Sequence, residues 1–115
     1  MTIISTELSN RRRDKRTGNP PLHIEFDGVT LTTLDWSLGG FLVEGYDGYL
    51  HAGDQLAVEI SFELDGHDFS HVTSIEVVRI EAYGNQLAAN FIGLDHDTIN
   101  MLEGLLTGRL HRQIM

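Results

Sequence analysis

A chain of 115 residues with 41% apolar side chains, a net charge of −9 and no cysteine fits one globular domain. This composition excludes disulfides and cysteine-based zinc sites, and the acidic surplus disfavours binding to a nucleic-acid polymer. No apolar run approaches the ~20 residues of a membrane span, and the N-terminus lacks the apolar segment of a signal peptide, so we expect a cytoplasmic protein without membrane insertion.

The charge is unevenly spread along the chain. Five of the eight basic residues lie within residues 11–16, whereas residues 21–115 carry three arginines and fifteen carboxylates. Residues 1–10 are polar and aperiodic and predict a flexible N-terminal arm. Residues 11–21, here called the basic arm, begin with the basic cluster and end in a stretch rich in glycine and proline. The cluster could grip a compact anion, although a solvated tail explains it equally well when it is taken alone.

From residue 22 onward, apolar side chains recur at every second position, which is typical of β-strands. Asp27-Gly28 and Asp65-Gly66 predict tight hairpin turns. Six short strands between residues 22 and 94 favour an antiparallel barrel. The alternating apolar positions include Leu22, Ile24, Phe26, Val29, Leu31, Leu56, Val58, Ile60, Phe62, Leu64, Ile75 and Val77.

The periodicity becomes helical after the last predicted strand. Apolar residues from Ile99 to Leu110 recur at spacings of three and four, and Asp95 or Asp97 is suited to cap the helix. We expect a helix over residues 96–112, stabilised mainly by docking of its apolar stripe. Residues 11–115 should therefore form a single all-β domain that ends in one α-helix.

The basic cluster contains an R-x-x-x-R motif formed by Arg12 and Arg16. An arginine presents a planar fork of donors that matches phosphate oxygens and also the O6/N7 edge of guanine. Two such forks on one arm could enclose a ligand that carries both phosphates and guanines.

A second motif, D-x-S-x-x-G, is formed by Asp35, Ser37 and Gly40. A carboxylate can accept the two adjacent donors of guanine, a serine two residues on lies on the same strand face, and a glycine permits close approach of a ligand or of backbone. Taken alone, the segment also fits a plain turn in which Asp35 and Ser37 bond to nearby amides. Trp36 could either pack inside the barrel or stack on a base, and Gly39 is a further candidate for ligand contact.

In this order and spacing, the two motifs resemble those of the PilZ domain family. The strand segments Val77-Val78-Arg79 and Ala88-Ala89-Asn90-Phe91-Ile92 resemble later strands of that family. The resemblance covers residues 11–106 and implies a six-stranded PilZ-type barrel that binds cyclic di-GMP. It implies ligand contacts from Arg12, Arg16, Asp35, Ser37 and Gly40, and Arg11 beside the motif raises the prospect of two ligands per chain.

We expect a bacterial second-messenger receptor whose basic arm is disordered without ligand and becomes ordered around it. One domain leaves no room for an output module, so the signal should pass to an unidentified downstream protein that controls motility, biofilm or polysaccharide. The alternative is a PilZ-like adaptor that binds proteins and no nucleotide.

The sequence gives no support for catalysis or for a metal site. There is no G-x-S-x-G elbow around Ser37, so we expect no enzymatic activity and no cofactor. His67 and His71 have a spacing seen in zinc sites on helices, but on a strand they would lie more than ~13 Å apart.

Overall fold

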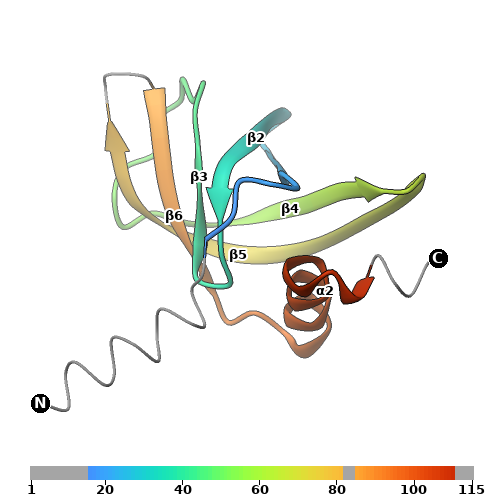
Figure 1. Cartoon of the computed structure of the whole chain (residues 1–115). Helices are drawn as coiled ribbons and strands as arrows, with labels where there is room; N and C mark the ends of the chain where they lie inside the picture. Colours follow the sequence, from blue (N-terminus) through green and yellow to red (C-terminus); the bar gives the residue numbers. More distant parts are fainter. Residues whose placement is uncertain (1–15, 82–84, 111–115) are drawn as a thin grey trace, which may run out of the picture.

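The computed structural model describes residues 16–81 and 85–110 of the chain. Antiparallel strands close into a barrel in the order β1-β2-β3-β6-β5-β4, with β4 paired back onto β1. Helix α2 follows the last strand and lies beside the barrel (Figure 1). The predicted six-stranded antiparallel barrel with a C-terminal helix is confirmed. The elements are β1 (His23–Phe26), β2 (Val29–Trp36), β3 (Gly40–Val43), β4 (Gln55–Leu64), β5 (His67–Glu81), β6 (Gln86–Ile92) and α2 (His96–Thr107).

Tight turns join two of the hairpins as the sequence predicts. Asp27 and Gly28 have φ angles of 52° and 74°, and Asp65 and Gly66 have angles of 52° and 82°. Two successive left-handed residues match the right-handed twist of the flanking strands, which explains the Asp-Gly pairs. The second of these hairpins is long, and β4 and β5 extend together well beyond the rest of the barrel (Figure 1).

The barrel interior is filled by the alternating apolar residues. Ile24, Ile60 and Ile75 are fully buried, and Trp36 occupies the same core. Val29 is an exception, since it is 44% exposed directly after the first hairpin turn. Leu56 and Leu64 are partly buried, and the other alternating positions are buried. This burial provides the hydrophobic stabilisation that a domain of this size needs.

Two β-bulges interrupt the alternation on the outer surface. The register shifts between Thr33 and Asp35 in β2, and again between Val77 and Arg79 in β5. The residues in between, Leu34 and Val78, are 40% and 46% exposed. Because each bulge adds one residue, every side chain beyond it changes face relative to a strict period of two.

Helix α2 begins where the sequence predicts and is interrupted at Gly108. The Asp95 carboxylate accepts a hydrogen bond of 2.7 Å from the Thr98 amide, and hydrogen bonding from the Thr98 side chain and amide holds the pKa of Asp95 below its usual value. The continuous helix ends at Thr107, because Gly108 adopts a left-handed φ of 77° and its amide bonds back to Leu105. Residues 109–110 are again helical, and residues 111 and 112 of the predicted helix lie outside the described residues, so its C-terminal boundary stays a prediction.

Candidate ligand-binding site

The described end of the basic arm is fixed to the end of β2. Thr17 and Trp36 form an antiparallel bridge in which each amide donates to the carbonyl of the other at 2.9 Å. Four residues along the chain from Arg16, the Pro20 carbonyl accepts a 2.8 Å hydrogen bond from Trp36 Nε1. These bonds place Arg16 directly beside the predicted Asp35 motif.

Arg16 lies across both polar side chains of that motif. Its Nε donates to Asp35 Oδ1 at 2.7 Å, a terminal nitrogen forms an ion pair with the same oxygen, and Nη1 lies 3.5 Å from Ser37 Oγ. The Arg16 and Asp35 side chains are 47% and 38% exposed. An ion pair this accessible to water contributes no more than about 1 kcal/mol, so either partner can be released at small cost. The structure thus brings Arg16, Asp35 and Ser37 together as the sequence predicts.

Ser37 has a structural function within the turn. Its side chain is fully buried, its hydroxyl accepts a 3.0 Å hydrogen bond from the Gly39 amide, and its own amide donates to the Gly40 carbonyl at 2.8 Å. The Gly39 carbonyl in turn accepts from the Phe91 amide at 2.9 Å. In this conformation Ser37 shapes the turn and supports Arg16, and ligand contact by its hydroxyl remains a prediction.

Gly40 is required by its neighbour on β6. A Cβ at this position would lie 2.0 Å from the Ala89 carbonyl oxygen and 2.9 Å from the Cα of Asn90. The glycine therefore permits close approach of backbone, one of the two roles predicted for it.

Trp36 belongs to the barrel interior. Its side chain is fully buried, and its indole nitrogen is occupied by Pro20. Of the two predicted roles, packing in the barrel is confirmed.

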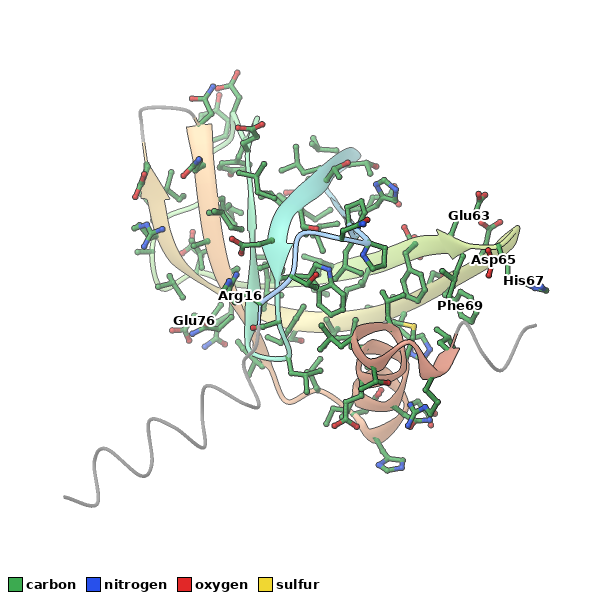
Figure 2. All side chains as sticks on the ribbon, viewed as in Figure 1. Arg16, Glu63, Asp65, His67, Phe69 and Glu76 are labelled. Atoms are coloured by element: carbon green, nitrogen blue, oxygen red, sulfur yellow. The ribbon has the colours of Figure 1, made fainter. Side chains whose placement is uncertain are left out.

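A hollow of about 290 Å³ opens on the outer face of the barrel beside Arg16. Figure 2 labels Arg16 and Glu76 near this side of the barrel, far from the β4–β5 turn. The lining comes from Arg16 and from four neighbouring strands, β2, β3, β6 and β5. The lining residues are Arg16, Asp35, Phe41, Leu42, Val78, Arg79, Ala88, Ala89 and Asn90.

Two of the predicted ligand contacts, Arg11 and Arg12, lie outside the described residues. The predicted conformation of the arm before Arg16 lies there as well. Arg79 and Asn90 also line the hollow, although the sequence pattern predicts them only as members of strands. The missing signal is the bulge at Val78, which a pattern of strict alternation does not reveal.

The described residues hold neither a candidate metal site nor a helix that could span a membrane. Within residues 16–81 and 85–110, no group of three histidine or carboxylate side chains is arranged to hold a metal ion. No helix in the same ranges combines the length and apolar character needed to cross a bilayer.

No family model and no curated protein matches the sequence. Solved structures do match the fold. The PilZ domain of CeSA, from a cellulose-synthesizing bacterium, superposes with a TM-score of 0.59 at 22% identity, over 84% of this chain and 98% of that domain. The fold is of the PilZ type.

Two longer proteins contain the same PilZ-type fold. The inhibitor of motility MotI/DgrA of Bacillus subtilis has a TM-score of 0.65 at 17% identity, over 84% of this chain and 49% of that one. YcgR of Escherichia coli, solved in complex with c-di-GMP, has a TM-score of 0.64 at 21% identity, over 90% of this chain and 47% of that one. This PilZ-type chain thus spans about half the length of either protein.

Proposed function

We propose that this chain is a cyclic di-GMP receptor that binds its ligand at the hollow beside Arg16 and relays the signal to a partner protein. One observation carries the proposal: the Arg16 guanidinium lies across Asp35 and Ser37 where Arg16 and Asp35 line a hollow. The YcgR complex with c-di-GMP supports this choice of ligand, because YcgR shares the fold.

The chemistry of the site suits a guanine nucleotide. Asp35 Oδ1 accepts from Arg16, and its carboxylate has further lone pairs for the N1–H and N2–H donors of guanine. The Arg16 fork can then turn to a phosphate or to the O6/N7 edge of a base. The exposed ion pair makes this exchange inexpensive, since a charged ligand replaces each partner that is lost.

Arginine substitutions test the proposal. Arg12→Ala and Arg16→Ala should each weaken cyclic di-GMP binding by roughly tenfold to a hundredfold or more, because each loses charge-assisted hydrogen bonds of about 1.5–3 kcal/mol. Isothermal titration calorimetry with cyclic di-GMP measures the change, and GTP and cyclic di-AMP serve as comparison ligands.

Arg109→Ala is the matched control. Arg109 bonds to Asn100 on α2 and takes no part in the hollow that Arg16 lines. The Arg109→Ala variant loses the same formal charge as Arg16→Ala. Because Arg109 lies outside the proposed site, the affinity of this variant for cyclic di-GMP should stay near that of the unaltered protein. Unchanged affinity in both Arg12→Ala and Arg16→Ala would place the ligand elsewhere.

We further propose that the ligand orders the part of the basic arm that precedes Thr17 and so creates a surface for the partner. Amide hydrogen exchange should slow across residues 11–16 when cyclic di-GMP is added, because phosphates neutralise five closely spaced cations. The Thr17 and Trp36 amides already bond to each other's carbonyls and provide an internal reference. Equal protection of residues 11–16 with and without ligand would contradict this step.

A nucleotide-independent adaptor is the second candidate function. Arg16 and Asp35 satisfy each other without a ligand, and the Ser37 hydroxyl is used inside its own turn. Partner capture that is the same with and without cyclic di-GMP, together with no measurable binding of the nucleotide, would favour the adaptor. In both cases we infer a non-catalytic binding module that acts in the cytoplasm.

A further inference from the structure

Four residues form one row across the outer face of the barrel. Asp35 on β2 pairs with Leu42 on β3, Leu42 pairs with Ala88 on β6, and Ala88 pairs with Arg79 on β5. All four line the same hollow. The row therefore ends in a carboxylate at one side and a guanidinium at the other, with two apolar side chains between them.

Each end of the row is placed by a β-bulge. Thr73, Ile75 and Val77 are buried at alternating positions of β5, so strict alternation would direct Arg79 into the barrel. The bulge at Val78 pairs Arg79 with Ala88 instead of with the buried Leu87, and Arg79 turns outward. The bulge at Leu34 does the same for Asp35 on β2. Bulges next to ligand sites commonly redirect a side chain in this way.

Arg79 is available to bind a ligand. Its Nε lies 2.9 Å from Glu81 Oε1, and the two side chains are 56% and 47% exposed. This pair is more accessible to water than the Arg16–Asp35 pair at the other end of the row. Separating it costs little, for the same reason.

The two charged ends of the row lie on strands that are not adjacent in the barrel. Three inter-strand steps of about 4.8 Å separate the ends of the row, which gives a span of about 14 Å at the backbone. Between the charged ends, the hollow of about 290 Å³ is lined by the apolar side chains of Leu42 and Ala88. A ligand held only by Arg16 and Asp35 would leave the Arg79 end of this row unused.

We propose that the binding site extends across all four strands and that Arg79 binds the half of the ligand that lies away from Asp35. Its fork requires two neighbouring acceptor atoms, such as a phosphodiester group or the O6/N7 edge of the second guanine. This inference rests on the proposed function, because it assigns the far end of the same cyclic di-GMP site.

Calorimetric titration of Arg79→Ala with cyclic di-GMP tests the inference. We expect a loss of affinity of roughly tenfold to a hundredfold. Glu81→Gln is the matched control, because it keeps Arg79 and releases it from its ion pair, so binding should be unchanged or tighter. Thermal unfolding midpoints close to that of the unaltered protein would show that Arg79 does not act through folding, and a midpoint that falls in step with affinity would overturn the inference.

The outcomes separate this inference from the proposed function. If the unaltered protein binds cyclic di-GMP, Arg16→Ala weakens it and Arg79→Ala stays within about twofold, the site ends before Arg79 and the inference is wrong. If the unaltered protein does not bind the nucleotide at all, the proposed function fails first and this extension fails with it.

Discussion

Trp36→Ala should destabilise the protein by about 3–5 kcal/mol, the usual cost of deleting a large aromatic side chain from a packed core. Trp36 is fully buried and has the largest volume of the fully buried side chains in the described residues. The same substitution removes the donor that binds the Pro20 carbonyl and so loosens the arm from β2. Since small domains have only about 5–15 kcal/mol of stability, urea unfolding followed by circular dichroism will show a large shift in midpoint.

Trp36→Phe is the companion variant and is expected to remain folded. It retains much of the apolar volume but leaves the Pro20 carbonyl without its indole donor, a loss of about 1–3 kcal/mol. The alanine variant must therefore be the less stable of the two. If the two variants unfold at the same denaturant concentration as the unaltered protein, Trp36 does not support the core as described.

Gly40→Ala should also cause a large loss of stability, about 3 kcal/mol, at the upper end for overpacked sites. The added Cβ would meet the Ala89 carbonyl oxygen at 2.0 Å, and this oxygen belongs to the backbone of β6 and cannot rotate away. Strands β3 and β6 would have to separate at the edge of the hollow. Thermal and urea unfolding measure the effect without any ligand.

Gly66→Ala in the β4–β5 turn is the control for this clash. Gly66 has a left-handed φ of 82°, but a Cβ there would meet nothing within 4 Å. Its cost comes from backbone strain alone and should be about 1–2 kcal/mol. A larger loss for Gly66→Ala than for Gly40→Ala would refute the close approach of β6.

The barrel was predictable because its strands follow local rules. Ile24, Ile60 and Ile75 are buried where alternation places them, and both Asp-Gly turns adopt the expected left-handed pairs. The bulges at Leu34 and Val78 were not predictable, because a bulge depends on how two strands pair and not on the residues of one strand. For that reason the outward turn of Arg79 could not be read from the sequence.

The helix shows a similar limit. A stripe that begins at Ile99 was predicted, yet Ile99 is only half-buried while Thr98 is fully buried. The Thr98 hydroxyl lies 3.2 Å from His71 Nδ1 on β5, so the polar group is satisfied inside the contact. Such a partner from a distant strand cannot be inferred from helical periodicity, because it depends on the tertiary fold.

The site also combines features that were predictable from the sequence with features that depend on the tertiary fold. Arg16 and Asp35 were each predicted as ligand contacts from the chemistry of phosphate and guanine recognition, whereas the ion pair between them was not predicted. The burial of Ser37 arises from the closure of its turn. The need for glycine at position 40 arises from the close backbone of β6. These two residues serve the scaffold directly, whatever they contribute to the ligand.

The hydrogen bond between the indole and Pro20 has a practical consequence. Trp36 is the only tryptophan of the chain. Its ring is shielded from water, and its nitrogen is bonded to the segment that leads to the arginine cluster. The tryptophan emission of the unlabelled protein therefore depends on one site, the junction between the arm and the sheet. A conformational change that is transmitted along the chain between these two parts should alter this emission.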